Sequence, residues 1–477
     1  MERFNFNIIK ELRLKNGMTQ KMLSQHLGIS NRAVSKWESG LSQPSASHIF
    51  RLAEIFNVPM DAFYERSQSV TVKPEPTGML SVTDIYKIGR GPSSSHTMGP
   101  EKACKIFKEH NPKADRFEAI LYGSLSKTGV GHGTDKVIKV TFDPTPCDVI
   151  FNNEDLELPH PNTMDLIAYK DGVEIKRIRV LSVGGGKIEI VGYKNVDPPK
   201  IYGLSTFSEI AEHCRKNHMK LWQYVEEVEG IEIRDYLMKI WNQMKLSIHI
   251  GLETEGVLPG GLNVKRKAKK LYSHQHIDES AQTKENRVVS AYAFAVSEQN
   301  ADGEVIVTAP TCGSAGVMPS VLYYQQMKRG YTDLEIVRAL ETGGIIGNLV
   351  KTNASISGSE CGCQAEIGTA CAMASAALGE LFSLEMDKIE YAAEIAIEHH
   401  LGLTCDPICG LVQIPCIERN AVAAMRAINA VSLASFLSDT RKISVDEVIE
   451  VMRMTGKDIP GRYRETAEGG LATLNIK

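Results

Sequence analysis

Cysteines and histidines are the residues of this 477-residue chain best suited to metal or acid–base chemistry, and it contains ten and 13 of them. Three cysteines stand in glycine- and proline-rich surroundings: Cys363 in Glu-Cys-Gly-Cys-Gln, Cys405 in Thr-Cys-Asp-Pro and Cys416 in Ile-Pro-Cys-Ile-Glu. Their spacings, 42 and then 11 residues, match neither the C-x-x-C pattern of zinc sites nor a ferredoxin pattern. Spacing alone therefore leaves two interpretations open, a set of metal ligands and three buried, inert thiols.

Three histidines, His96, His132 and His160, lie in loops rich in glycine, serine and threonine. A loop of this kind before a helix offers hydroxyl groups and backbone N–H groups to an anion, and histidine exchanges protons near neutral pH. One histidine alone is more often structural, but three in similar settings favour a site. The hydroxyl groups around His96 predict an anionic ligand; they belong to Ser93, Ser94, Ser95 and Thr97.

Composition describes an ordinary globular protein, with 43% hydrophobic and 23% charged residues. The length exceeds what one hydrophobic core supports, so several folding units are expected. No stretch approaches the roughly 18 uninterrupted apolar residues of a membrane span, and the first residues lack a signal-peptide pattern. We therefore expect a cytoplasmic protein with no membrane partner, whose cysteines are thiols rather than disulfides.

Residues 6–64 predict a bundle of short helices that includes a helix-turn-helix. Thr19 is suited to cap a helix over 20–27, Gly28 permits a sharp turn, and Ser30 is suited to cap a second helix over 31–39. The pattern resembles the helix-turn-helix of the Cro and phage-repressor type. Such a module binds DNA, although a bundle that only mediates assembly is the alternative. The resemblance places five side chains against DNA: Gln20, Asn31, Arg32, Ser35 and Lys36.

The charge of this region agrees with a nucleic-acid partner. Residues 1–66 hold nine Lys or Arg against six Asp or Glu, a net charge of +3, and the remainder holds 45 against 52, or −7. Because this kind of helix-turn-helix reads two half-sites, we also expect a homodimer.

Breaks in the pattern divide the chain into domains 1–66, 78–198 and 199–477, with a proline-containing linker at 67–77. In the second domain we expect a helix over 100–109 and β-rich segments at 136–142 and 187–193. In the third we expect long helices at 205–228, 233–250, 285–298, 370–382 and 420–436. The predicted fold class is multidomain α+β: a small all-α helix-turn-helix domain, a mixed α/β middle domain and a large, mostly all-α C-terminal domain.

The two later domains resemble the β and α domains of the bacterial iron-sulfur L-serine dehydratases. In the middle domain the motifs are the three histidine loops and Ser182-Val-Gly-Gly-Gly186. In the last domain they include Thr308-Ala-Pro-Thr-Cys-Gly-Ser-Ala-Gly316, Lys351-Thr-Asn-Ala-Ser-Ile-Ser-Gly358, Tyr463-Arg-Glu-Thr-Ala-Glu-Gly-Gly-Leu471 and the sequences around the three cysteines. The resemblance covers almost everything after the linker.

This resemblance implies an activity and a site. The activity is the oxygen-sensitive conversion of L-serine to pyruvate and ammonia. Cys363, Cys405 and Cys416 would hold a [4Fe-4S] cluster with one open iron, which makes that iron a Lewis acid, and the three histidines would be acids or bases. Substrate contacts are implied for the hydroxyl loop around His96 and for Thr308, Thr311, Gly313, Ser314, Asn353 and Ser355.

The chain departs from the family pattern at two further cysteines. Cys409 stands where the family usually has glycine, and Cys312 where alanine or asparagine is common. We expect both thiols to be inert. The sequence ends Leu474-Asn-Ile-Lys477, so we expect no terminal cysteine ligand for the open iron of the kind that some relatives carry.

Two alternatives remain at this stage. A pyridoxal-phosphate dehydratase would catalyse the same net reaction, but no lysine stands in a matching context. The protein could instead be a transcriptional regulator. Its dehydratase-like region would then sense serine or redox state, and its DNA-binding module would carry out the function.

Overall fold

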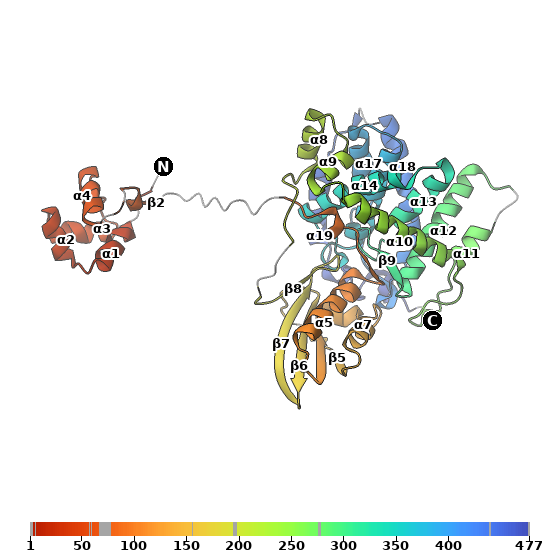
Figure 1. Ribbon diagram of the computed structural model, residues 1–477, viewed down its shortest axis with the longest axis horizontal. Helices are drawn as coiled ribbons and strands as arrows, with labels where there is room; N and C mark the ends of the chain where they lie inside the picture. Colours follow the sequence, from red (N-terminus) through yellow and green to blue (C-terminus); the bar gives the residue numbers. More distant parts are fainter. Residues whose placement is uncertain are drawn as a thin grey trace. The chain divides into compact units, whose positions relative to one another are not determined.

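The computed structural model describes residues 3–4, 6–56, 58, 60–65, 78–154, 156–193, 198–274, 278–437 and 440–475. The chain forms two compact units, Met1–Thr77 and Gly78–Lys477, each of which is described by itself (Figure 1). The predicted linker, 67–77, lies outside the described residues.

The first unit is the expected small helical domain. Its helices are α1 (Phe6–Lys15), α2 (Gln20–Leu27), α3 (Asn31–Glu38) and α4 (Ala46–Phe56), with the 3-10 turn η1 (Met60–Phe63) and the short paired strands β1 (Arg3–Phe4) and β2 (Tyr64–Glu65). The hydroxyl of Thr19 accepts a hydrogen bond from Met22 N, and that of Ser30 accepts one from Ala33 N. Gly28 has φ +70°, as the turn between α2 and α3 requires. The predicted caps and turn are therefore confirmed.

The second unit contains a five-stranded sheet of order β5-β4-β6-β7-β8. Its strands are β4 (Arg116–Leu121), β5 (Cys147–Phe151), β6 (Thr163–Lys170), β7 (Val173–Ser182) and β8 (Ile188–Ile190); β4 and β5 are parallel and the other pairs antiparallel. Helices α5 (Gly99–His110) and α7 (Thr134–Phe142) pack against the sheet (Figure 1), where Phe107, Phe117 and Phe142 meet in one buried cluster.

One secondary-structure prediction for this region is wrong. Residues 136–142, predicted to be β-rich, form most of α7. Local propensity favours a strand because the segment contains Val137, Ile138, Val140 and Thr141. The helix instead buries Ile138 and Phe142, which are four residues apart, and leaves Val140 74% exposed. Packing against α5 and β5 therefore overrides local preference. The helix predicted at 100–109 is confirmed.

Helices make up the rest of the second unit. The segment predicted as helical at 205–228 divides into α8 (Phe207–Lys216) and α9 (Leu221–Glu229). The longer predicted helices are present, with ends shifted by several residues. The full set continues with α10 (Ile233–Glu253), α11 (Ala268–Ser273), α12 (Ala281–Ala301), α13 (Val317–Arg329), α14 (Asp333–Asn353), α15 (Gly358–Cys361), α16 (Thr369–Leu381), α17 (Met386–Glu398), α18 (Cys416–Leu437) and α19 (Val445–Asp458). The multidomain α+β class is confirmed.

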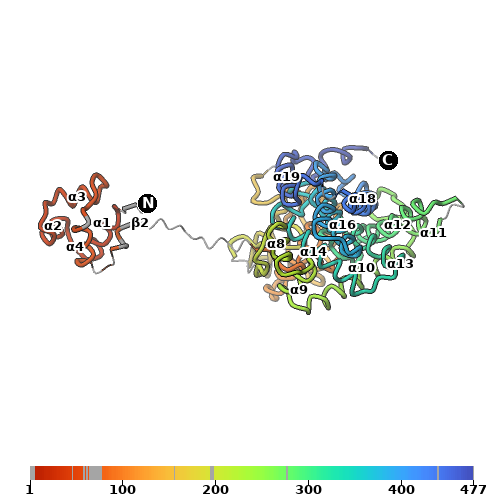
Figure 2. The backbone as a smooth tube through the Cα atoms, turned by 90° about the horizontal axis from the view of Figure 1, so that it is seen from above, coloured from red at the N-terminus to blue at the C-terminus, as the bar shows by residue number. Residues whose placement is uncertain are grey.

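The core of this helical region is α16, all of whose residues are buried. It lies among α13, α14, α17 and α18, and Figure 2 shows α14 and α18 on either side of it. Helix α18 is long and apolar enough to span a membrane by length and composition, although 44% of its most apolar window is buried in the protein. Its contacts with α12, α16 and α17 account for the buried part of that apolar surface.

A two-stranded ladder joins the middle region to the helices and positions the first histidine loop. Strand β3 (Ile88–Arg90) pairs antiparallel with β9 (Val305–Val307), which follows α12. The hydroxyl loop begins directly after β3, and the segment from Thr308 begins directly after β9. Two stretches that are distant in sequence therefore start side by side.

Candidate active site

The loop that carries His96 is a tightly packed turn of helix. Residues Ser94–Met98 form one π-helical turn, η3, directly before α5, and the Ser93 hydroxyl accepts a hydrogen bond from His96 N at its start. π turns are rare and are frequently found at functional sites. It buries Ser93, Ser94, Ser95, His96 and Thr97 almost completely.

The hydrogen bonds of His96 define its tautomer. Its Nε2 lies 3.1 Å from Ser124 Oγ, and the Ser124 hydroxyl donates its own hydrogen to the main-chain oxygen of Glu465 at 2.7 Å. Nε2 must therefore carry the proton, and Nδ1 accepts from Ser95 Oγ at 2.9 Å. Burial lowers the pKa of His96 well below its ordinary value, so the ring is neutral.

His132 follows α6 (Gly123–Thr128) and is held in the opposite tautomer. Its Nδ1 donates to Thr128 O at 3.0 Å, and its main-chain oxygen accepts from the Thr97 hydroxyl at 3.0 Å. Burial lowers the pKa of His132 to about 4. Nε2 therefore presents a lone pair, 3.5 Å from Oε1 of Glu465. The rings of His96 and His132 are 4.3 Å apart between centroids.

His160 is engaged at both ring nitrogens. Nδ1 accepts from Asn162 N at 3.0 Å, and Nε2 lies 3.1 Å from Oε1 of Glu360, which also accepts from the Ser355 hydroxyl. Burial raises the pKa of Glu360, but the bonds from His160 and Ser355 outweigh it and lower that pKa overall. These contacts make His160 and Glu360 a fixed pair.

The three cysteines meet in one buried cavity, named here the inner cavity. Cys363 precedes the π turn η4 (Gln364–Gly368), Cys405 lies in a loop bridged to Arg464, and Cys416 begins α18. The thiols are free, as are all ten cysteines of the chain. The cavity also contains His132 and two carboxyl groups; its lining is Pro92, Ser93, His132, Gly313, Cys363, Glu366, Ile367, Cys405, Pro407, Val412, Cys416 and Glu465.

The electrostatics of the thiols suit a soft metal centre. A hydrogen bond between Cys363 and Cys405 lowers the pKa of the first and raises that of the second, and burial raises the pKa of Cys416. Burial opposes the charge of Arg419, but the neighbouring Cys363 and Cys416 raise its pKa, so one cation stands beside the thiols. Three soft donors around a single cavity, next to a fixed positive charge, fit an iron-sulfur cluster better than a hard cation.

Two carboxyl groups of the inner cavity were missed by sequence analysis. Burial raises the pKa of Glu366, whose Oε1 accepts from the Thr311 hydroxyl at 2.6 Å. Burial, followed by the nearby Glu366, raises the pKa of Glu465 well above its ordinary value. Glu465 has φ +59° and its N–H donates to Cys405 O, so the backbone directs the side chain inward. Both could have been found from the sequence, since Glu366 lies three residues after Cys363 and Glu465 lies within the family motif at 463–471.

The structure brings only some of the predicted substrate contacts to the inner cavity. Ser93 and Gly313 line it, and Thr311 reaches it through Glu366. Thr308 bonds to Ile85 O and Ser314 to its own loop. Asn353 donates to Ser205 O and Leu349 O, and Ser355 bonds Glu360. Ser94, Ser95 and Thr97 do not line the inner cavity; Ser95 bonds His96, and Thr97 bonds the main chain of His132.

The two additional cysteines stand outside the inner cavity's lining. Burial raises the pKa of Cys312, which contacts Met98 through sulfur at 3.5 Å. Cys409 is exposed and has φ +56°, a conformation that favours glycine. The glycine expected there by family resemblance is therefore the residue that the backbone prefers.

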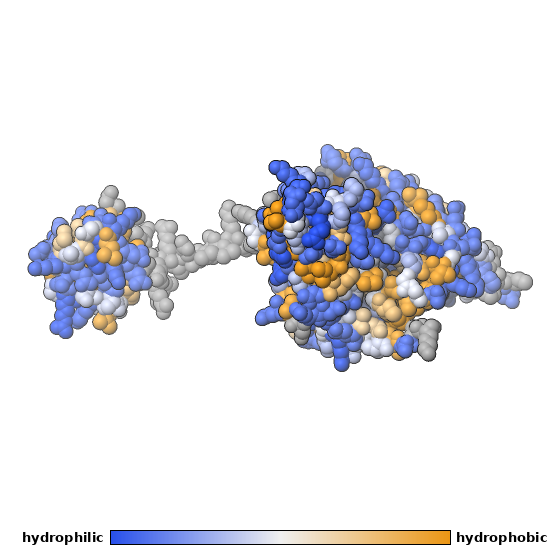
Figure 3. Space-filling model, turned by 90° about the horizontal axis from the view of Figure 1, so that it is seen from below, coloured by the Kyte–Doolittle hydropathy of each residue, from blue (hydrophilic) through white to orange (hydrophobic). Residues whose placement is uncertain are grey.

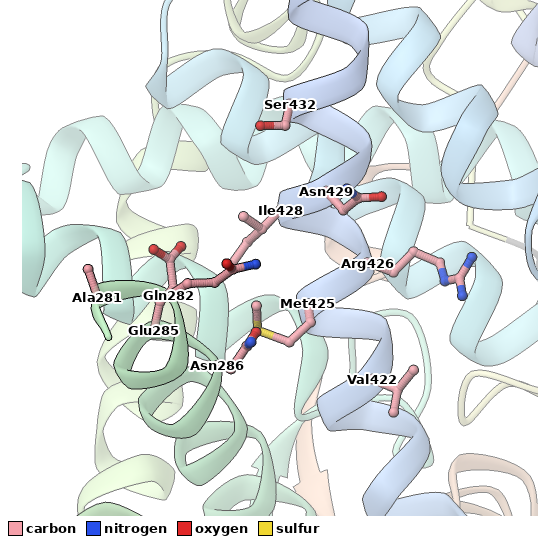
Figure 4. Close-up of a pocket in the computed structure, with 10 residues that line it drawn as sticks. All are labelled: Ala281, Gln282, Glu285, Asn286, Val422, Met425, Arg426, Ile428, Asn429 and Ser432. Atoms are coloured by element: carbon pink, nitrogen blue, oxygen red, sulfur yellow. The ribbon is translucent and has the colours of Figure 1, made fainter. Parts of the chain in front are cut away.

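A larger cavity, of about 710 Å³, lies away from this chemistry (Figure 4). It is a groove between the start of α12 and the outer face of α18, and its lining contains neither cysteine nor histidine. In Figure 4 Met425 points toward α12, whereas Arg426 points away from it. The inner cavity is smaller, but it holds the converging reactive groups.

The predicted DNA-facing side chains of the first unit lie mostly on one exposed surface. On α3, Asn31, Arg32, Ser35 and Lys36 are exposed, while Val34 and Trp37 are buried against the other helices. Gln20 is partly buried and donates to Glu38 Oε2 at 2.8 Å. Glu38 also forms a bidentate pair with Arg13.

The inner cavity brings together thiols, a neutral histidine and buried carboxyl groups, which are donors suited to metal binding and to acid–base chemistry. Sequence comparison gives the family. The model of the serine dehydratase alpha chain matches residues 205–472, that of the serine dehydratase beta chain matches residues 81–144, and a helix-turn-helix model matches residues 9–63. The chain belongs to the serine dehydratase family and carries an N-terminal helix-turn-helix domain.

Individual relatives agree over most of the chain. It is 38% identical to an L-serine dehydratase of Streptomyces coelicolor, 39% to one of Haemophilus influenzae and 40% to the L-serine dehydratase TdcG of Escherichia coli K12. Each match covers 83% of this chain and 99% of the relative.

Proposed function

We propose that the protein is an L-serine ammonia-lyase, which deaminates L-serine to pyruvate and ammonia. One observation carries the proposal: a neutral histidine, His132, presents the lone pair of Nε2 to a buried cavity that also holds three thiols. The names of the relatives supply the substrate.

The three thiols would hold the cofactor. Cys363, Cys405 and Cys416 are the residues of this chain that fit a [4Fe-4S] cluster. When bound, such a cluster with three protein ligands supplies a Lewis acid at its open iron, which assists departure of a hydroxyl group.

His132 is the base in this proposal. The α-proton of serine is weakly acidic, so its removal needs a base that is unprotonated at working pH and correctly aimed. Thr128 O fixes the proton of His132 on Nδ1, and a pKa of about 4 keeps Nε2 free. His160 lacks a free ring nitrogen, and His96 already accepts from Ser95. We therefore assign His96 and His160 to positioning.

Glu465 completes the proton balance. The departing hydroxide needs a proton to leave as water, and burial keeps the Glu465 carboxyl protonated. Its Oε1 is 3.6 Å from Nδ1 of His96 and 3.5 Å from Nε2 of His132. Loss of the α-proton to His132 and of the hydroxyl group, which leaves as water with the proton of Glu465, gives aminoacrylate. Aminoacrylate tautomerises to an imine, which hydrolyses to pyruvate and ammonia, and transfer of the proton from His132 back to Glu465 restores both residues.

The experiment is a measurement of pyruvate release from L-serine by full-length protein prepared and reconstituted without oxygen. Activity that disappears in air, together with loss of iron, supports the proposal. A fully loaded protein that releases no pyruvate contradicts it and favours the sensor alternative.

For the first unit we propose binding of duplex DNA by a homodimer. The exposed polar and basic face of α3 supports this role, since a recognition helix needs such a face over a buried apolar one. DNA affinity measured for the iron-free, cluster-loaded and serine-bound forms tests whether the enzyme also acts as a sensor. Equal affinities in all three would exclude that coupling.

The ten free thiols of the chain suit the reducing environment of the cytoplasm, which is the compartment proposed for the protein.

A further inference from the structure

A second cavity, named here the outer cavity, adjoins the inner one. Its volume is about 390 Å³, near the lower end of the range of roughly 300–1,000 Å³ typical of small-molecule sites. Pro92 and His132 line both cavities. Any molecule in the outer cavity therefore lies next to the base assigned above.

Its charge is positive. Arg90, at the end of β3, and Lys136, in the first turn of α7, both line it and are exposed. Arg90 makes one long contact, 3.5 Å, to Gly303 O, and Lys136 forms no hydrogen bond or ion pair within the part of the chain that the structure describes. The acidic residue of the lining, Asp302, is already paired with Arg266. Two cations without a carboxylate partner favour an anionic ligand.

The outer cavity also has an apolar wall. Val130, Val137 and Val140 line the same cavity, and Val130 and Val140 are 67% and 74% exposed. Figure 3 shows that apolar residues, in orange, form patches on the otherwise hydrophilic face of the larger unit that it presents. Serine has no hydrocarbon chain that could cover these valines, so the wall fits a larger ligand with an apolar body.

We propose that the outer cavity binds a small branched aliphatic carboxylate, with its charge at Arg90 and Lys136 and its chain on the three valines. Binding of this carboxylate does not depend on the proposed dehydratase function. Its effect on catalysis does rest on that function: the bound carboxylate blocks the approach to His132 and competes with serine.

The test uses full-length, iron-free protein and 3-methylbutanoate, with binding followed by calorimetry. Two probes separate the contributions: 3-methylbutan-1-ol keeps the chain without the charge, and acetate keeps the charge without the chain. We expect both to bind about tenfold more weakly or worse. Equal binding of the alcohol would overturn the assignment of the charge, and equal binding of acetate that of the valine wall.

Variants locate the site. Arg90→Gln with Lys136→Gln should weaken 3-methylbutanoate binding about tenfold, and Val140→Thr should weaken it without a change in charge. Lys139→Gln, on the same helix but outside the lining, is the matched control and should leave affinity unchanged. An unchanged affinity of the double variant would overturn the proposal. These experiments measure binding and not turnover, so their result can be interpreted even if the dehydratase assay fails. In active enzyme, 3-methylbutanoate should raise KM for serine and leave kcat unchanged.

Discussion

Oε1 of Glu465 lies 3.5 Å from Nε2 of His132, so the C-terminal loop places a carboxyl against a histidine of the middle region. The same oxygen lies 3.6 Å from Nδ1 of His96, and Ser124 connects His96 to the main chain of Glu465. The base and its neighbours are thus assembled from both halves of the second unit. Neither half alone contains the site.

Replacing His132 with asparagine should remove the proposed base. We expect kcat for serine to fall by about 10²–10⁴-fold, because proton removal at the α-carbon loses its acceptor. Iron content should be unchanged, since the cysteines remain. His110→Asn is the matched control: His110 contacts Ile106 O four residues earlier, as His132 contacts Thr128 O, but it is exposed. Full activity of the His132 variant would refute the assignment.

Glu465→Gln tests the proton donor. Glutamine keeps the shape and a hydrogen-bonding group but cannot donate the carboxyl proton, so we expect kcat to fall by about 10²-fold with little change in KM. Glu468→Gln, three residues later on an exposed side chain paired with Lys127, is the control. If the two variants were equally active, the role given to Glu465 would be wrong.

Local signals in the sequence predicted local features correctly, and long-range packing explains the failures. The caps Thr19 and Ser30 depend only on neighbouring residues, so their helix starts were predictable. The strand expected at 136–142 became α7 because α5 and the sheet bury one helical face of it. Apart from its place in a family motif, nothing in the sequence distinguishes Glu465 from the other polar residues of its loop. Its burial beside His132 depends on contacts between segments that are distant in the chain.

Serine substitutions at the three cavity cysteines should separate ligands from bystanders. Cys363→Ser, Cys405→Ser and Cys416→Ser should each lose most of the bound iron and sulfide, and the broad visible absorption with them. Cys312→Ser and Cys409→Ser should retain both, because neither residue lines the inner cavity. Retention of a full cluster by any of the first three variants would contradict the proposed ligand set.

The stability of the iron-free second unit should depend on pH through His132. Its pKa is about 4 in the folded protein and near the ordinary 6.5 when unfolded, so between these values the unfolded chain binds more protons. Stability therefore rises with pH across this window, by about 3 kcal/mol for this group, and is constant above it. Denaturant unfolding of the wild type and of His132→Asn at several pH values gives the contribution by difference. A difference that stays flat from pH 4 to 7 would show that His132 is not buried as a neutral ring.

Arg32 on α3 is the side chain with which to test DNA recognition. It is exposed on the polar face of the helix, whereas Gln20 is partly held by its bond to Glu38. With a duplex selected from random sequences by the full-length protein, Arg32→Ala should weaken binding by about 1–3 kcal/mol, roughly 5–150-fold. Lys10→Ala, which removes the same charge from exposed α1, should have a smaller effect. If the two variants lose affinity equally, and only in proportion to charge, then α3 does not read the sequence and the domain binds DNA by its net charge alone.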